Sequence, residues 1–364
     1  MAKTYTLNVA GLTRELPICK VNDHMDIAAF IMFSDVELTE ACAAALLRRE
    51  GYDVRGLYLE TGSGEAEGAR SCAGAMDLPL EVVDARSELE EHVCRPFAES
   101  YRRGETPSPC VLCNPSVKLR MLCEYADALG ARYIATGHYA RSEGGALYMG
   151  RPENDQSYML CRILPEQLSR LLLPLGGMIK TETRALAASL GLPVAQKPDS
   201  MELCFVPGGD YAAWLEQRGD APEPGDIIYN GKAVARHGGI HRFTLGQRRG
   251  LGYAAGKRVY VSEIRPDTGE VVLADGDGLY STEFAASDMR WLVPEPHSPF
   301  DCGVRVRHSR TLTHARAWPE GGGRLRIVPA SPLRAPTPGQ AAAIYSGGRV
   351  LGGGFVSRDT KDTI

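Results

Sequence analysis

Two cysteines three residues apart are the side chains best suited to chemistry in this sequence. Cys110 and Cys113 lie in TPSPCVLCN, residues 106–114, where prolines stiffen the backbone ahead of a helix that we expect to begin near Ser116. The positive end of a helix favours the thiolate form of a nearby cysteine, and thiolate is the form that attacks electrophiles or carries sulfur. The pair therefore indicates thiol chemistry.

Other interpretations of these cysteines stay open. A Cys-x-x-Cys pair can be half of a zinc site, although the sequence shows no second such pair, or His pair, at suitable spacing. The two thiols can also be small buried hydrophobic groups. A third cysteine, Cys204, follows polar turn residues in KPDSMELCF, and taken alone it favours a position in the core.

Alternating strand and helix patterns surround the cysteine pair. Residues 52 to 140 contain the strand-like runs DVRGLYLE, LEVVDA and RYIATGH, with helical stretches near 65 to 77 and 87 to 103. This βαβ pattern predicts an open parallel sheet, whose ligands usually bind beyond the carboxyl ends of the strands. Gly137 and His138 follow one such end and mark a candidate crevice.

The second half of the chain changes character twice. Residues 160 to 218 have a helical pattern, with PEQLSRLLL and TETRALAASLG as the clearest helices and Gly191 as a C-cap. Beyond the PEPG segment at 222–225, short alternating strands are broken by glycines, and Asp267-Thr268-Gly269 marks a hairpin turn. This last part predicts an all-β region of one or two small barrels.

Composition limits the classes of protein that remain. A chain of 364 residues predicts two or three domains, and no apolar run approaches the ~18 residues of a membrane span. The start lacks the features of a secretory signal, and ten cysteines diluted in a long chain fit a reducing compartment, so we expect a cytoplasmic protein. The net charge of -4 leaves RNA binding to local basic patches. These patches are Gln247-Arg248-Arg249, Lys257-Arg258 and Arg305/Arg307/Arg310.

Half a dozen motifs, from about residue 48 to the C-terminus, resemble the bacterial tRNA 2-thiouridylases. They are TPSPCVLCN, YIATGHYAR, NDQSYMLCRI, KPDSMELCFVPGGDYAAWLE, FTLGQRRGLG, and TPGQAA with LGGGF. The resemblance implies an α/β fold with a Rossmann-like parallel sheet of the PP-loop ATP pyrophosphatase type, a small helical linker domain and a C-terminal β-barrel domain. The expected bounds are 1–47 for an atypical N-terminal segment, 48–160, 161–222 and 223–364.

The same resemblance implies a reaction on the wobble uridine of certain tRNAs. ATP, with Mg²⁺, would adenylate the C2 oxygen of the base, and sulfur would then displace AMP. Cys204 would carry the sulfur as a persulfide, delivered by a cysteine desulfurase or a sulfur-relay protein. Attack by the Cys113 thiolate would release sulfide and leave a Cys113–Cys204 disulfide.

Binding residues follow from the resemblance position by position. Contact with the target base falls on Ser108, Pro109 and Cys110, with Ser108 in place of the more usual Asn. The remaining nucleotide and tRNA contacts fall on Leu59 and Gly137, and on His138, Asn154, Asp155, Gln156, Arg307, His308 and Gln340. Asn154 replaces a Lys and His308 a Tyr, and each tRNA position could bind phosphate or a base edge. No metal site is expected.

The segment expected to form the ATP-binding loop does not match the family's motif. The SGGxDSS phosphate loop should occupy Asp35 to Ala41, where the sequence reads DVELTEA. Glycines let backbone N–H groups close around a phosphate, and three carboxylates here would repel a triphosphate. Ser34-x-x-Glu37 instead predicts a capping box at the start of a helix over 37 to 50. ATP binding in the family's manner is therefore not expected.

The first 47 residues resemble a different family. Residues 5 to 47 are similar to the opening of adenine-phosphoribosyltransferase-like proteins, but no Asp-Asp…Thr-Gly phosphoribosyl-diphosphate loop follows. A fusion of two genes at the ACAAALL stretch would explain the junction. The leading hypothesis is thus a tRNA-uridine 2-sulfurtransferase with impaired ATP chemistry, and the alternative is a non-catalytic tRNA-binding or sulfur-carrying protein of that family.

Overall fold

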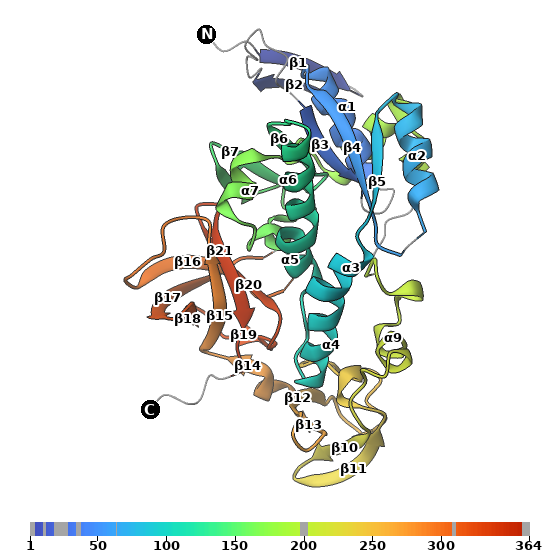
Figure 1. Cartoon of the computed structure of the whole chain (residues 1–364). Helices are drawn as coiled ribbons and strands as arrows, with labels where there is room; N and C mark the ends of the chain where they lie inside the picture. Colours follow the sequence, from blue (N-terminus) through green and yellow to red (C-terminus); the bar gives the residue numbers. More distant parts are fainter. Residues whose placement is uncertain are drawn as a thin grey trace. The chain divides into compact units, whose positions relative to one another are not determined.

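The chain folds into two compact units. The computed structural model describes residues 4–9, 12–17, 28–33, 38–62, 64–196, 203–307 and 311–358, with only the backbone described before residue 38. The first unit comprises Met1–Leu89 and Cys113–Phe205, and the second comprises Glu90–Leu112 and Val206–Ile364 (Figure 1).

A five-stranded parallel sheet forms the centre of the first unit. Its strands, in spatial order, are β5 (Leu80–Asp84), β4 (Asp53–Glu60), β3 (Ala28–Phe33), β6 (Tyr133–Ala135) and β9 (Leu171–Leu172). Every pairing in it is parallel, which confirms the predicted sheet. The central strand β3 was not predicted. The short hairpin of β1 (Thr4–Val9) and β2 (Leu12–Pro17) precedes it.

Three helices of the first unit share one hydrophobic core. They are α1 (Leu38–Arg49), α2 (Ala66–Ala75) and α8 (Lys180–Ser189), and their buried residues include Ala44, Cys72 and Leu186. Gly191 ends α8 at a φ of +64°, as its predicted C-cap role requires. The other elements of the unit are α3 (Arg86–Leu89), α6 (Leu119–Ala128), α7 (Pro165–Arg170), η3 (Ser157–Leu160), η4 (Pro193–Gln196), and a hairpin of β7 (Ala140–Glu143) and β8 (Ala146–Met149).

A helix and a small sheet open the second unit. After the π-type turn η1 (Glu90–Cys94), α4 (Arg95–Arg102) packs Phe97 edge-on against Tyr211 and Trp214 of α9 (Tyr211–Gln217). The sheet that follows has the order β11-β10-β13-β12. Its strands are β10 (Gly225–Tyr229), β11 (Lys232–His237), β12 (Tyr260–Arg265) and β13 (Glu270–Ala274), with η5 (Pro207–Gly209) and η6 (Ile240–Arg242) before and between them. The predicted turn at 267–269 joins β12 to β13, with Gly269 at a φ of +68°.

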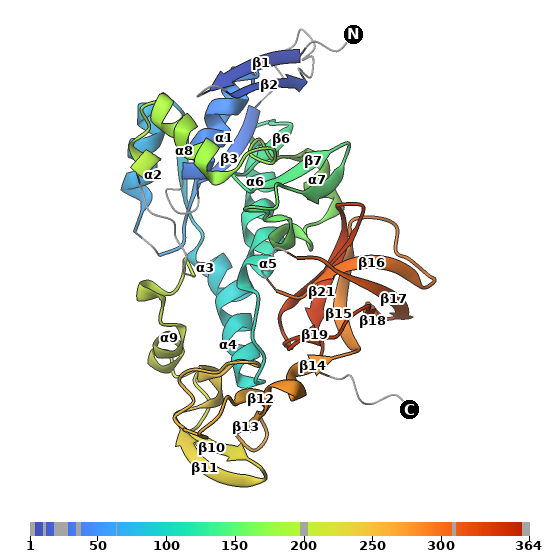
Figure 2. The ribbon, with the colours of Figure 1, turned by 180° about the vertical axis from the view of Figure 1, so that it is seen from behind.

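A closed barrel of six antiparallel strands completes the second unit, orange to red in Figure 2. The strands are β15 (Phe284–Trp291), β16 (Phe300–Arg305), β17 (Thr313–Gly321), β18 (Arg324–Pro329), β20 (Ala341–Ser346) and β21 (Arg349–Val356). Two short strands, β14 (Tyr280–Ser281) and β19 (Leu333–Arg334), pair beside it after the turn η7 (Gly276–Leu279). The predicted C-terminal barrel is thereby confirmed.

The glycines of LGGGF allow this barrel to close. Strand β21 pairs with β15 to complete the circle of strands. A Cβ on residue 352 would lie 2.2 Å from the carbonyl oxygen of Arg290, and one on residue 354 would lie 2.5 Å from that of Ser287. Any larger residue would force the two strands apart, so the motif is explained by close backbone approach.

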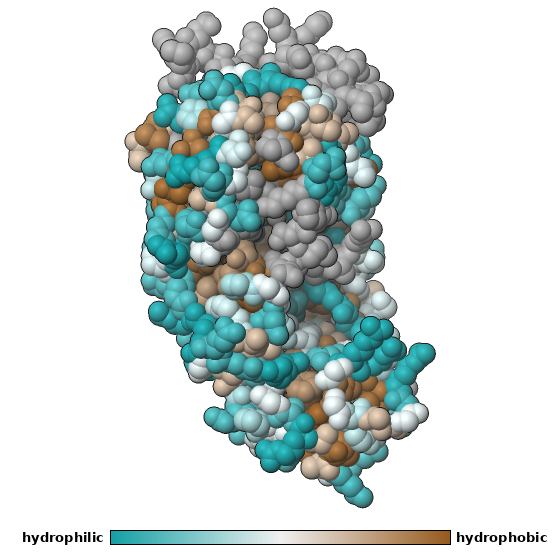
Figure 3. All heavy atoms as spheres, turned by 90° about the vertical axis from the view of Figure 1, so that its right-hand side faces the viewer, coloured by the Kyte–Doolittle hydropathy of each residue, from teal (hydrophilic) through white to brown (hydrophobic). Residues whose placement is uncertain are grey.

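Hydrophobic surface is distributed in separate patches on the face shown in Figure 3, where hydrophilic residues surround them. Among the described residues, no helix has both the length and the apolar character needed to cross a bilayer.

Candidate active site

The cysteine pair lies inside a helix, which corrects the predicted start near Ser116. Helix α5 covers Pro109–Cys113 and continues through the π-type turn η2 (Asn114–Lys118) into α6. Pro109 suits the first helical position because its missing N–H is not needed there. Cys110 is exposed and Cys113 is buried, so the two thiols face different surroundings one helical turn apart.

Pro115 explains why this helix contains a π-type turn. A proline within a helix lacks the N–H that would bond the carbonyl four residues earlier, and its ring crowds that carbonyl. Here the turn widens, and the N–H of Leu119 donates to the carbonyl of Asn114 five residues back. The Pro115 carbonyl accepts a bond of 2.8 Å from Gln167 Nε2, which satisfies it from outside the helix.

Asn114 fixes the helix immediately after Cys113. Its side chain is 2% exposed, and its Nδ2 donates to the carbonyl of Met159 at 2.9 Å. Gln167 also accepts from the N–H of Leu164 at 3.0 Å, so both amides tie the thiol-bearing helix to segments 45 and 52 residues later. Sequence reasoning missed these positioning residues, and the only signal for them was the proline inside a helical pattern.

Cys204 belongs to the same unit as Cys113. Its side chain is partly buried, and residues 197–202 before it lie outside the described residues. After it the chain turns at η5 and enters α9, where Asp210 caps the helix by accepting from the N–H of Ala213 at 3.0 Å. The convergence of the two sulfur atoms stays a prediction.

The first turn of α1 occupies the position expected for the phosphate loop. Residues 34–37, including the predicted capping box, lie outside the described residues. Thr39 and Glu40 are 7% and 8% exposed, and the Thr39 hydroxyl donates to Glu40 Oε2 at 2.7 Å. A carboxylate is therefore buried at this helix start.

Gly137 closes the space in front of that turn. A Cβ at residue 137 would lie 2.6 Å from Thr39 Cβ and 2.9 Å from the backbone nitrogen of Glu40. Burial, followed by the charge of Glu40, raises the pKa of Cys72 to about 11. Burial, then Cys72 and Glu40, raises the pKa of Cys42 to about 12. A second anion at this turn would meet a carboxylate and a packed main chain, so the described residues do not fit a triphosphate.

Leu59 and Gly137 nevertheless occupy the expected edge of the sheet. Strands β4 and β6 flank β3, and these two residues lie at or just beyond their carboxyl ends. Chain order reverses direction at β3, and such a switch point is where ligands bind in open parallel sheets. Leu59 itself is buried, at 1% exposure.

The loop before α5 is held by the barrel's TPGQ turn. Gln340 Nε2 donates to the carbonyls of Thr106 and Pro107 at 3.0 and 3.2 Å, and Ser108 Oγ accepts from the N–H of Ala341 at 3.0 Å. The structure thus brings together Ser108, a predicted target-base contact, and Gln340, a predicted tRNA contact, which are more than 200 residues apart in sequence.

Comparison with known proteins decides the family. A tRNA methyl transferase HUP domain model matches residues 36–208, a tRNA methyl transferase PRC-barrel domain model 213–275 and an aminomethyltransferase beta-barrel domain model 281–356. The tRNA-specific 2-thiouridylase MnmA of Sorangium cellulosum is 42% identical over 86% of this chain and 88% of its own length. The chain belongs to the tRNA-specific 2-thiouridylase family.

Two further relatives match to a similar extent. The tRNA-specific 2-thiouridylases of Rhodospirillum centenum and Rickettsia canadensis are 40% and 38% identical, over 86% and 94% of this chain and 88% and 99% of their own lengths. Among solved structures, a predicted subunit of tRNA methyltransferase from Methanocaldococcus jannaschii has a TM-score of 0.34 at 15% identity, covering 53% of this chain and 88% of that one.

In this 2-thiouridylase-family chain, His138 is a neutral ring. Burial, followed by the charge of Lys118, lowers the pKa of His138 to about 3. Its Nδ1 lies 2.8 Å from the hydroxyl of Thr136. A neutral imidazole suits a base edge or a sugar hydroxyl better than a phosphate. Of the two tRNA groups predicted for His138, phosphate or base edge, the neutral ring therefore favours the base edge.

The predicted tRNA contacts at 154–156 also shape their own loop. Asp155 is buried and accepts from the N–H groups of Gly150 and Ser157 and from the Ser157 hydroxyl. Gln156 bonds the backbone of Tyr139 through its side chain and its own N–H. Asn154 is partly buried, and its Nδ2 has no partner among the described residues.

Two of the predicted basic patches offer exposed guanidinium groups. Arg248 and Arg249 are exposed, and neither pairs with a carboxylate in the part of the chain that the structure describes. Arg307 is exposed, and its Nη2 donates to the carbonyl of Arg334 at 2.8 Å, while His308 lies outside the described residues. In that same part of the chain, no three His, Cys, Asp or Glu side chains gather as a metal site.

Proposed function

We propose that this chain is a tRNA-uridine 2-sulfurtransferase by descent, which retains the sulfur-carrying half of the reaction and has lost ATP-dependent activation of the base. The relatives' name supplies the reaction class, and Cys113 and Cys204 supply the thiols at the motif positions. The proposal sets the reaction in the cytoplasm, because its substrate is tRNA and its sulfur comes from a cysteine desulfurase or sulfur-relay partner.

The observation that carries the loss of activation is the closed first turn of α1. Glu40 places a buried carboxylate where a triphosphate would need N–H donors, and Gly137 packs directly against the same turn. Like charge at hydrogen-bond distance in a buried site opposes anion binding strongly. The proposed reaction of this chain therefore contains no step that uses ATP.

The retained half-reaction is thiol–disulfide chemistry. The Cys113 thiolate attacks the inner sulfur of a Cys204 persulfide, the S–S bond of the persulfide breaks, and hydrosulfide leaves with the electron pair. A Cys113–Cys204 disulfide forms, and an external thiol reduces it for the next cycle. The sulfide would reach a base held near Ser108, Pro109 and Cys110.

Titration of labelled ATP onto the purified protein, with and without tRNA, tests the lost step. We expect no saturable binding in either condition. The matched control restores the family loop with D35S, V36G, E37G, T39D, E40S and A41S, and this variant should bind ATP. Saturable binding by the unaltered chain would contradict the proposal.

Labelled sulfur tests the retained step. After incubation with a cysteine desulfurase and [35S]cysteine, we expect reductant-sensitive label to accumulate on Cys113→Ala, less label on the wild type because Cys113 releases it as hydrosulfide, and none on Cys204→Ala. Label that persists on Cys204→Ala would show that another thiol carries the sulfur. 2-Thiouridine formed with ATP, above the level of the Cys204→Ala control, would instead favour the complete enzyme.

A further inference from the structure

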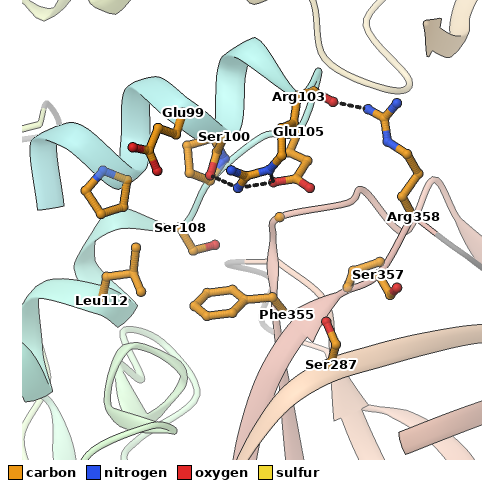
Figure 4. A pocket seen from close by; sticks show the side chains of 14 residues that line it. Glu99, Ser100, Arg103, Glu105, Ser108, Leu112, Ser287, Phe355, Ser357 and Arg358 are labelled. Atoms are coloured by element: carbon orange, nitrogen blue, oxygen red, sulfur yellow. Dashed lines mark hydrogen bonds and ion pairs between the residues drawn. The ribbon is translucent and has the colours of Figure 1, made fainter. Parts of the chain in front are cut away.

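A cavity of about 350 Å³ lies in the second unit, beside the loop that precedes the thiol-bearing helix. Residues from α4, the 103–108 loop, α5 and barrel strands β15 and β21 line it (Figure 4). This volume falls within the range of small-ligand sites, ~300–1,000 Å³. It has room for one nucleoside and excludes a duplex.

One wall of the cavity is aromatic and apolar. Phe355 extends from β21 into the cavity on the same side as Leu112 of α5 (Figure 4). Its neighbours Gly354 and Val356 are buried, while the Phe355 ring is only partly so. Pro96 and Pro107 add flat apolar surface. A partly exposed aromatic ring in a cavity of this size is a stacking surface for a planar ligand.

Two carboxylates, of Glu99 and Glu105, and two guanidinium groups, of Arg103 and Arg358, line the cavity, so its lining carries no net charge and favours an uncharged ligand. Arg103 is paired with Glu105 at 2.8 Å and also donates to Ser100 Oγ at 3.2 Å, so its charge is balanced within the protein. Ser108 Oγ already accepts from Ala341, which leaves its O–H to donate. Ser287 adds a second hydroxyl. Hydroxyl donors and acceptors beside an aromatic face suit a nucleobase better than a phosphate.

We propose that this cavity holds an unstacked base of the RNA substrate that neighbours the thiolated uridine. The target uridine must reach the thiols, yet neither Cys110 nor Cys113 lines the cavity, whereas Leu112 on another face of the same helix does. Ser108 joins the cavity to the predicted target-base contact. The inference rests on the proposed function, because RNA binding supplies the base.

Abasic scanning combined with a substitution at Phe355 tests the cavity. Binding of the full chain to anticodon stem-loops is measured with single abasic sites around the target uridine. One position should lose roughly 5- to 100-fold in affinity, the usual range for one stacked base. Phe355→Leu keeps apolar volume but loses the aromatic face, so it should cost a similar factor with intact RNA.

The two losses should not add, because both remove the same contact. Phe355→Tyr retains the ring and should bind as wild type, and so should Phe300→Leu, which removes a partly buried barrel ring outside the cavity. Circular dichroism checks that each variant is folded. Wild-type affinity in Phe355→Leu, or additive losses at every abasic position, would overturn the inference.

A second experiment distinguishes failure of the proposed function from failure of the base-site inference. If the wild-type chain binds no stem-loop, saturation-transfer NMR with free uridine and adenosine still tests the cavity. A nucleoside signal that Phe355→Leu abolishes would support the base site. No signal, or one unchanged in Phe355→Leu, would refute it.

Discussion

His138 combines a desolvated ring with a position at the end of a sheet strand. Burial and Lys118 lower its pKa to about 3, so the ring takes up no proton near neutral pH. Thr136 holds Nδ1 at 2.8 Å, which leaves Nε2 as the atom for an outside partner. A neutral ring can recognise a base edge and contributes no charge to phosphate binding.

This depressed pKa predicts a pH-dependent stability. The unfolded chain binds a proton on His138 near its ordinary pKa of about 6.5, whereas the folded chain resists it down to about 3. Stability is therefore complete above about pH 6.5 and falls as the pH drops toward 3, by at most ~1.4 kcal/mol per pH unit for this group. Urea unfolding between pH 7 and 5 should show a shallower pH dependence for His138→Gln. An unchanged slope would contradict the assignment.

Among helices and strands, the junction of β6 with α1 has no room for an added side chain. Gly137 touches both the side chain and the main chain of α1's first turn, so no rotamer change can make room for a methyl group. The junction fixes α1 against the sheet and closes the phosphate position at the same time.

Gly137→Ala should therefore destabilise the chain by about 1–3 kcal/mol, the usual cost of overpacking. The matched control is Gly74→Ala, since Gly74 lies in helix α2 and a Cβ added there would have nothing within 4 Å. The control should be neutral or more stable by up to ~1 kcal/mol, because alanine favours a helix. Thermal and urea unfolding measure both. Equal effects of the two substitutions would argue against the close packing.

Local patterns predicted many elements but not their partners. Strands β4 and β5 and the turn at 267–269 followed from residue type and spacing, because each signal lies within a few residues. The start of α5 did not, because Pro107 and Pro109 suggested a loop. The helix passes Pro115 through a π-type turn, and the Pro115 carbonyl accepts from Gln167, 52 residues away. The bond between Gln340 and the 106–108 loop is equally non-local. The sequence could therefore predict both as candidate site residues but not the contact between them.

Over the chain as a whole, RNA binding must rest on charge distribution rather than on net charge. The total of -4 repels a polyanion weakly at long range. Arg248 and Arg249 form a local exposed pair of guanidinium groups in the second unit. Their contacts with phosphates would release counterions and make the affinity depend on salt.

The double variant Arg248→Ala, Arg249→Ala should lower tRNA affinity and reduce the slope of log K against log[salt] by ~1–2, about one for each phosphate contact. Arg265→Ala is the control, because Arg265 is already paired with Glu263 and Glu270. It should leave the slope unchanged. Fluorescence anisotropy over a range of KCl concentrations measures both, and equal slopes for all three proteins would exclude this patch.

Strand β3 is joined to β4 and β6 in parallel register through its main chain, and it lies within residues 5–47, whose resemblance to another family stays a prediction from sequence. Main-chain pairing requires only an extended segment of adequate length. A strand of different sequence can therefore take the central position of a parallel sheet. The turn after such a strand has no comparable tolerance, since its chemistry depends on individual glycines and hydroxyls. An exchange of sequence in front of Leu38 can thus leave the sheet intact and remove one step of the reaction. The fold and the activity of this unit can therefore change independently in evolution.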